Sequence, residues 1–310
     1  MTKSVHFRHR GELYLFLGAL TFSVNGVFST VVLEHMSAFR LAQIRAIVAF
    51  AILLLFALIK RRDWLRVKRS EIPLLLSYGV IGFALVNVGY FLGIERKLPL
   101  GLVLILEFTA PIWVVLWIKY VRKGFVARDM WLAIALALIG LVMVAKVWDG
   151  FTFDLLGTLG AIGSAFALTG YFLIGEKILK DRAPMSATII GLGVAGTFWA
   201  LVLPIWNFPT EIFSVKMDIH GYLAGHLFPG WSLLLWIIVM GTIVPYIFVI
   251  SGLSLLSASK SSVIGMLEPV LAGLFAWIWL SQGWDLIQLF GAVIVLIGVY
   301  LADRSKMTVN

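Results

Sequence analysis

The chain has 310 residues, of which 61% are hydrophobic and only 13% are charged, and its mean hydropathy is +1.00. This composition excludes an ordinary water-soluble protein and predicts an integral membrane protein. The net charge of +9 would suggest nucleic acid as a partner, but a membrane protein also uses lysine and arginine in its loops to set its orientation.

Ten apolar windows of about 20 residues follow one another with short polar breaks, and each can cross a bilayer as a helix. Strands would need alternating polarity, which the windows lack, so the expected fold class is an all-α integral membrane protein. The first window is a full crossing with no cleavage site after it, so we expect an anchor rather than a signal peptide. The expected spans are 11–33, 38–59, 71–94, 98–121, 127–146, 153–175, 184–205, 231–255, 258–280 and 285–302.

The distribution of lysine and arginine predicts the orientation. With the N-terminus in the cytoplasm, the cytoplasmic segments hold 19 of the 25 basic residues and the opposite loops hold 5. Because basic loops resist translocation, we expect a multi-pass protein of the cytoplasmic (inner) membrane with both termini cytoplasmic. This use accounts for the positive charge, so no nucleic-acid partner is expected.

Short motifs recur in the same order in the two halves of the chain. Phe22, Gly26 and Phe28 are echoed by 166, 170 and 172, "LE" at 106–107 returns at 267–268, and "LIG" at 138–140 returns at 296–298. The polar stretch 206–230 accounts for the growing offset, and we expect a short interfacial helix in it. Five spans is an odd number, so the second copy is inverted. We therefore predict two five-helix repeats, 11–148 and 152–303, around a central cavity, as in secondary transporters.

Four polar residues of the first half fall at one depth in the predicted membrane. Asn25, Arg45, Asn87 and Glu107 lie seven to nine residues from the outer ends of their spans, or about 10–14 Å deep at 1.5 Å per residue. Intramembrane charges are costly and usually pair with one another or face a wet interior. We therefore expect Arg45 to be the partner of Glu107.

Two interpretations of this layer remain open. In the first, Arg45 and Glu107 form a structural ion pair that fixes two helices. In the second, the layer contacts a polar substrate, or Glu107 carries a proton for coupling. Glu268 has the mirrored depth in the ninth span, and Lys260 is the nearest cation along the chain. For Glu268 a purely structural role, as part of an "EP" helix break, is at least as well supported.

Aromatic residues and prolines complete the candidate site. Tyr90 and Tyr246 are expected at the cavity, whereas Tyr171 and Trp199 are better explained as an interfacial belt. Three prolines within spans each free a backbone carbonyl and are candidate hinges or gates, namely Pro111, Pro245 and Pro269.

Several motifs give no support for an enzyme. "GLGVAG" at 191–196 matches a dinucleotide fingerprint but has no strand before it, and the chain contains no phosphate-binding G-x-x-x-x-G-K-[ST] loop. The five histidines lie in tails or loops and the chain contains no cysteine, so neither a metal site nor a catalytic triad is expected. We expect no cofactor.

The segments 87–117 and 242–280 resemble the EamA-type transporters of the drug/metabolite transporter superfamily, and the resemblance covers nearly the whole chain. Within that family, "LPLG" at 98–101, "LEFT" at 106–109, "PY" at 245–246 and "EP" at 268–269 are similar to the threonine and homoserine exporter branch. The resemblance implies ten helices in two inverted halves around a cavity. One departure is "SQG" at 281–283, where the family often has a Gly-Glu pair.

We therefore expect a secondary transporter that exports a small amino acid or related metabolite by alternating access. Its partners would be a small-molecule substrate, membrane lipid and protons as a candidate coupling ion. Two alternatives remain: an exporter of aromatic amino acids or lipophilic cations, recognised by aromatic rings and carboxylates, and a non-transporting membrane scaffold or assembly subunit.

Overall fold

A computed structural model describes residues 2–146, 148, 154–280, 285–305 and 307–308. Within these ranges nine helical spans are long and apolar enough to cross a membrane. The tenth expected crossing is the 17-residue helix α7 (Arg128–Val144), which lies against α14. The described chain is thus the all-α membrane protein that its hydropathy predicts.

Each predicted span corresponds to one helix or to consecutive helical segments. In the first half these are α1 (Thr2–Leu33), α2 (Ala38–Lys60), η1 (Arg62–Leu65), η2 (Arg69–Glu71), α3 (Ile72–Gly79), η3 (Val80–Leu85), α4 (Val86–Glu95), α5 (Leu100–Glu107), α6 (Ala110–Leu116), η4 (Trp117–Val121), β1 (Phe125–Val126) and α7 (Arg128–Val144). In the second half they are α8 (Leu155–Ile178), α9 (Pro184–Val202), η6 (Ile205–Asn207), η7 (Thr210–Phe213), β2 (Lys216–Asp218), η8 (Gly221–Leu223), β3 (Leu227–Pro229), α10 (Gly230–Ile238), η9 (Val239–Ile243), α11 (Val244–Leu253), α12 (Ala258–Gly265), α13 (Leu267–Leu280), α14 (Leu286–Arg304) and β4 (Met307–Thr308).

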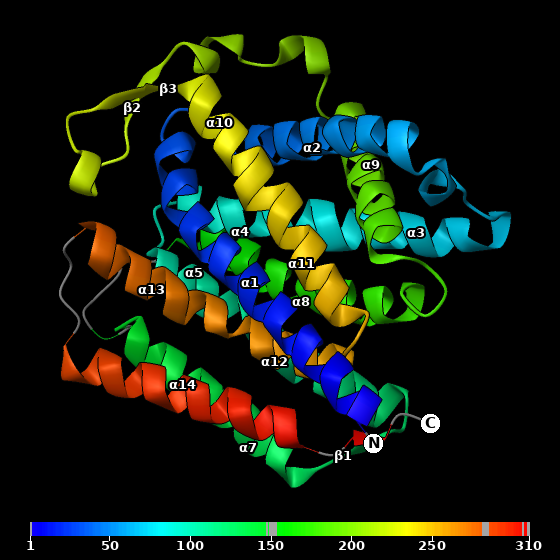
Figure 1. The fold of residues 1–310 in the computed structure, drawn as a ribbon. Coiled ribbons are helices and arrows are strands. Elements are labelled where there is room, and N and C mark those ends of the chain that lie inside the picture. The colour runs from blue at the N-terminus through cyan, green and yellow to red at the C-terminus, as the bar shows by residue number, and fades with distance from the viewer. Residues whose placement is uncertain (1, 147, 149–153, 281–284, 306, 309–310) are drawn as a thin grey trace.

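Helices of one half pack on helices of the other half, and each such contact has an equivalent contact between the corresponding helices of the two repeats. The first span (α1) lies on the eighth (α11), and its counterpart, the sixth (α8), lies on the third (α4). The remaining spans pair with their own counterparts: α2 with α9, α5 and α6 with α13 and α12, and α7 with α14. Figure 1 shows α7 and α14 side by side along one edge of the bundle. This is the pairing expected of two inverted repeats related by a pseudo-twofold axis.

Glycines allow two of these cross-half pairs to approach closely. A Cβ atom added at Gly140 of α7 would lie 2.5 Å from the carbonyl oxygen of Gly291 in α14. One added at Gly89 of α4 would lie 2.6 Å from the carbonyl oxygen of Gly160 in α8. Small residues at a membrane helix interface permit such backbone contact, so these glycines have a packing role.

Both halves interrupt the same two spans. The fourth span breaks between Glu107 and Ala110, and the ninth breaks between Gly265 and Leu267. The third and eighth spans each contain a π-helical segment, η3 and η9. Broken helices and π-bulges are frequent at functional sites, because they leave backbone groups without their regular partners.

The connection after α9 contains no interfacial α-helix, so that expectation was wrong. It forms short 3₁₀ turns and a hairpin of β2 and β3, with Lys216 opposite Pro229. Asp218 accepts hydrogen bonds from the N–H groups of His220 (2.7 Å) and Gly225 (2.8 Å), which hold the pKa of its carboxyl below the ordinary value. Three 3₁₀ turns and a hairpin satisfy the backbone of this polar segment locally, without the apolar face that an interfacial helix needs.

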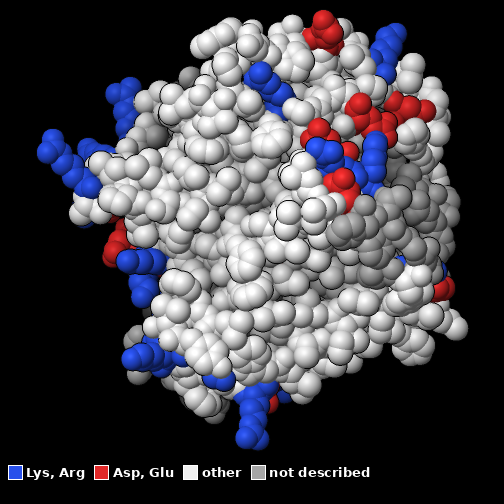
Figure 2. All heavy atoms as spheres, turned by 180° about the vertical axis from the view of Figure 1, so that it is seen from behind, with Lys and Arg blue, Asp and Glu red and all other residues white. Residues whose placement is uncertain are grey.

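The surface agrees with a membrane location. In Figure 2 a broad white surface occupies the middle of the molecule, and Lys and Arg gather along the left edge. That edge corresponds to the side on which Figure 1 marks both termini. Large apolar side chains such as Leu55, Ile59 and Phe290 are exposed on helices, as expected for contact with lipid.

Candidate functional site

A cavity lies between the two halves, where the broken fourth and ninth spans meet the third and eighth spans. Its volume is about 90 Å³, and a single buried water needs about 10–15 Å³, so several waters or a small ligand fit. All seven predicted binding residues line it. The complete lining is Leu15, Ala19, Phe22, Asn25, Arg45, Gly82, Val86, Asn87, Tyr90, Glu107, Phe108, Leu168, Tyr171, Phe172, Tyr246, Val249, Ser261, Gly265 and Glu268.

Arg45 does not pair with Glu107, so the predicted ion pair was wrong. The guanidinium of Arg45 donates to Thr242 Oγ1 (2.8 Å) and to the carbonyl oxygen of Gly241 (2.6 Å). It also lies over the ring of Phe91, 4.8 Å from the centroid. Depth along a helix placed Arg45 and Glu107 in one layer, but α2 faces the π-helical segment η9 rather than α5.

Pro245 explains why Gly241 is available to Arg45. A proline has no N–H, so the carbonyl four residues earlier in the helix loses its usual donor. In the eighth span that carbonyl belongs to Gly241, and Arg45 supplies the donor instead. Arg45 therefore supplies a hydrogen bond that Pro245 removes from a helix of the opposite half. Two of its five N–H groups donate to Gly241 and Thr242.

The two intramembrane carboxyl groups have different surroundings. Glu107 is 7% exposed and its Oε1 lies 2.7 Å from Ser164 Oγ of α8. Glu268 is half-buried, and it forms no hydrogen bond or ion pair with the described residues. It does interact electrostatically with Arg45 and with Glu107. Glu268 is therefore the carboxyl group with its hydrogen-bonding capacity open to the cavity.

Among the amides and tyrosines of the predicted site, Asn87 and Tyr246 form a hydrogen bond between the two halves, whereas the amide oxygen of Asn25 has no partner in the described part of the chain. Asn87 Nδ2 donates to Tyr246 Oη (2.7 Å) and to the carbonyl oxygen of Phe83 (2.6 Å). Asn87 is on α4 and Tyr246 on α11, which are counterparts in the two repeats. Asn25 Nδ2 donates to Ser29 Oγ (3.2 Å), and its Oδ1 has no hydrogen-bond partner among the described residues.

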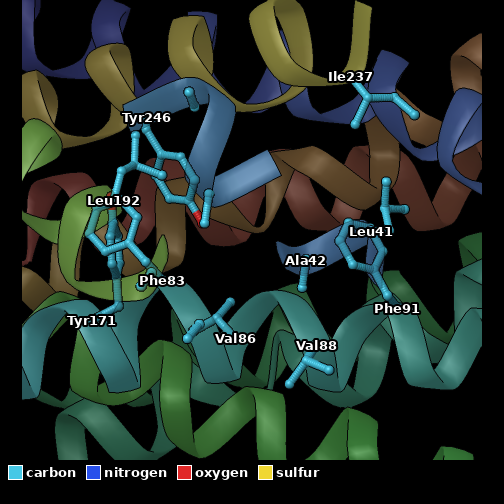
Figure 3. Packing of buried hydrophobic residues seen from close by; sticks show 14 of the residues in the cluster. Leu41, Ala42, Phe83, Val86, Val88, Phe91, Tyr171, Leu192, Ile237 and Tyr246 are labelled. Atoms are coloured by element: carbon cyan, nitrogen blue, oxygen red, sulfur yellow. The ribbon is translucent and has the colours of Figure 1, made fainter. Parts of the chain in front are cut away.

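An aromatic wall was missed by the sequence analysis. The ring of Phe22 meets that of Tyr246 edge-on, with centroids 5.3 Å apart, and Tyr246 lies 6.0 Å from Tyr171, which contacts Phe172 at 5.4 Å. Figure 3 shows Tyr246, Phe83 and Tyr171 gathered in one group. Tyr171 had been assigned to an interfacial belt. The repeat signal could have found this wall, because Phe22 and Phe172 are both members of the echoed motifs.

The remaining candidates lie around the cavity rather than in it. Trp199 is buried on α9, where its ring packs edge-on against Phe39 with centroids 6.0 Å apart. Pro111 stands at the start of α6, just after the break of the fourth span. Pro269 lines a second hollow of about 410 Å³ between α5, α7 and α13. The hinge role of the three prolines stays a prediction.

Among the described residues, no group of three or more His, Cys, Asp or Glu side chains could hold a metal ion. The departure noted at Ser281, Gln282 and Gly283 lies outside the described residues. The polar and aromatic groups that line the cavity are an arginine, two carboxyl groups, two amides, a serine hydroxyl and aromatic rings.

Comparison with known proteins decides the family. The model of the EamA-like transporter family matches the chain twice, at residues 9–146 and 155–302. The chain belongs to the EamA-like transporter family. Family membership and the names of its relatives indicate a transporter rather than an enzyme.

Relatives that are named as transporters or exporters align with most of the chain. The threonine/homoserine exporter RhtA of Escherichia coli (strain K12) is 27% identical over 269 residues, which are 84% of this chain and 82% of RhtA. The pseudopaline exporter CntI of Pseudomonas aeruginosa is 23% identical over 296 residues, 96% of each chain. The uncharacterized transporter YdfC of Bacillus subtilis is 25% identical over 269 residues, 86% of this chain and 80% of YdfC. The predicted likeness to EamA transporters and threonine/homoserine exporters is confirmed.

A solved crystal structure shares this EamA fold. It matches with a TM-score of 0.73 at 16% sequence identity, over 95% of this chain and 96% of the other. At this level of sequence identity the match supports the fold alone.

Proposed function

We propose that this EamA member exports a small amino acid or a related zwitterionic metabolite across the cytoplasmic membrane by alternating access. Both termini lie in the cytoplasm in this proposal, and protons are the coupling ion. The exporters RhtA and CntI support export of small metabolites as the general activity. The substrate class is argued from the cavity.

One observation carries the proposed substrate class. Arg45 and Glu268 face the same cavity and interact electrostatically, yet they form no ion pair with each other. Arg45 keeps unused N–H groups, and the carboxyl of Glu268 accepts no hydrogen bond from the described residues. A zwitterion fits this arrangement, because its carboxylate can accept from Arg45 while its ammonium group donates to Glu268.

Contacts between the two halves, beyond one end of the cavity, support alternating access. Phe172 and Ser261 line the cavity, and they lie near the C-terminal end of α8 and the N-terminal end of α12. About one helical turn beyond them, Glu176 of α8 pairs with Arg122 and also accepts a hydrogen bond from the N–H of Ala258 (2.9 Å). This cluster joins the two halves, so opening the cavity at this end requires it to separate.

The aromatic wall favours a second candidate. Phe22, Tyr171, Phe172 and Tyr246 present rings to the cavity, and a carboxyl group beside aromatic rings suits a cation. An exporter of aromatic amino acids or lipophilic cations would use the same Glu268 without needing Arg45.

Transport by the purified protein in liposomes tests the proposal. Labelled amino acids should exchange across the membrane, and Glu268→Gln should reduce the flux at least tenfold because the ammonium group loses its counter-charge. The matched control is Glu211→Gln, which changes an exposed glutamate in the loop after α9 and should leave the flux unchanged. A protein that moves none of the labelled compounds would instead fit a membrane scaffold.

Competition by truncated substrates separates the two candidates. For a zwitterion site, neither the decarboxylated amine nor the N-acetylated acid of a transported amino acid should compete well, because each lacks one pole. If the amine competes as well as the amino acid, the cation candidate replaces the zwitterion.

A further inference from the structure

Three oxygen atoms from three helices lie in a row beside the cavity. Glu107 Oε1 of α5 lies 2.7 Å from Ser164 Oγ of α8, and Ser164 Oγ lies 2.9 Å from the carbonyl oxygen of Val86 in α4. Ser164 is fully buried and Glu107 is 7% exposed. The row links the second half of the chain, through α8, to two helices of the first half.

The number of protons in this row can be counted. Each of the two contacts is at hydrogen-bond distance and needs one hydrogen atom between its oxygens. A serine hydroxyl carries one hydrogen, and a carbonyl oxygen carries none. If Ser164 donates to Val86, the hydrogen of the other contact must come from the carboxyl group of Glu107. If Ser164 donates to an ionised Glu107, two oxygens are left 2.9 Å apart without a hydrogen, which is repulsive.

The charges around Glu107 favour the same protonated state. The titratable groups that interact with it are Tyr90 of α4, Tyr246 of α11 and Glu268 of α13. Among the described residues no lysine or arginine forms an ion pair with Glu107, and the hydrogen bonds of Arg45 go to η9 rather than to Glu107. A buried carboxylate without a cation, facing a second carboxyl group, is costly.

We propose that Glu107 is a proton-binding site and holds its proton in this conformation, while Glu268 is the carboxyl group left for the substrate. When Glu107 releases its proton to water in the cavity, the hydroxyl hydrogen of Ser164 turns to the new carboxylate. The hydrogen bond from Ser164 to Val86, which joins α8 to α4, is then lost. A coupling role for this proton in transport rests on the proposed function. The presence of the proton on Glu107 does not depend on that function.

Infrared spectroscopy of the purified full-length protein in heavy water at neutral pH tests the site directly. The wild type should show the carbonyl stretch of a protonated carboxylic acid. That band should disappear in Glu107→Gln and remain in Glu268→Gln. The Glu107→Gln variant should fold, because the glutamine amide can donate to Ser164 as the protonated acid does.

A serine variant tests the hydrogen bond. Ser164→Ala removes the acceptor, so the carboxylic acid band should shift to higher frequency. Thr169→Val is the matched control. It removes another buried hydroxyl from α8, one that faces the carbonyl oxygens of Ala165 (2.8 Å) and Ala110 (3.3 Å) and not Glu107, and it should leave the band in place. The proposal is overturned if the wild type lacks the band, if the band follows Glu268 instead, or if Ser164→Ala does not move it. These outcomes are independent of any transport measurement.

Discussion

Glu107 and Glu268 occupy repeated positions in the two halves, and one nearby side chain accounts for their different surroundings. Ser164 of α8 reaches the carbonyl oxygen of Val86 and the carboxyl of Glu107. Among the described residues no side chain or backbone N–H donates to Glu268 in the same way, so the second carboxyl stays open to the cavity.

Arg45 gives a prediction at the same scale. The planar guanidinium group of Arg45 donates to Gly241 and Thr242 at the same time. Arg45→Lys keeps the positive charge, but an ammonium group lacks this fork and cannot make both hydrogen bonds in the same geometry. We expect the free energy of unfolding to fall by about 1.5–3 kcal/mol, as for a lost hydrogen bond to a charged group. Thermal unfolding in detergent measures this, with Arg69→Lys at an exposed position as control. Equal unfolding temperatures for the two variants would show that Arg45 does not stabilise the eighth span.

At the scale of single elements, the site lies where helices of the two repeats lose their regular α-helical geometry at equivalent points. The π-helical segments η3 and η9 lie in the third and eighth spans, and the breaks lie in the fourth and ninth. The regular helices α7 and α14 pack against each other and against α12 and α13 of the broken ninth span. An ion pair at the start of α14, Lys146 Nζ to Asp285 Oδ2 at 2.6 Å, reinforces the pair.

Close glycine packing between α7 and α14 can be tested by adding a methyl group. In Gly140→Ala the new Cβ would meet the backbone of Gly291 and Val295 within 3 Å, and a helix backbone cannot easily move aside. We expect a loss of about 1–3 kcal/mol of unfolding free energy. Gly163→Ala on α8 is the control, because nothing lies within 4 Å of its Cβ, and it should be neutral or stabilise by up to about 1 kcal/mol. Equal loss in both variants would contradict the packing role.

At the scale of the whole molecule, the helix pairs of the two halves are related by a pseudo-twofold axis, and the cavity lies between the halves near this axis. The contact between Asn87 and Tyr246 joins counterpart helices beside this axis, at 2.7 Å. One end of the bundle carries both termini and the basic edge seen in Figure 2, and the other carries the hairpin of β2 and β3. A transporter of this form has two chemically different ends, and the proposed topology assigns the basic end to the cytoplasm.

The topology can be measured with single cysteines, because the chain contains none of its own. Arg62→Cys lies in the basic loop after α2, and Tyr222→Cys lies in the exposed loop after α9, where the tyrosine is 69% exposed. In intact cells a membrane-impermeant thiol reagent should label Tyr222→Cys and spare Arg62→Cys. Detergent should make both react. The reverse labelling pattern would place the termini outside.

The sequence by itself determined the crossings and the two repeats, and it predicted a common depth for the polar layer. Each of these depends only on distance along the chain, which hydropathy and helix rise convert directly into height in the membrane. Tertiary structure alone decided which polar groups of that layer touch. Arg45 meets η9 instead of Glu107, and Ser164 meets Glu107, because those contacts depend on how each helix is rotated and which helix of the opposite half it faces. A residue's position along the chain does not encode that lateral arrangement.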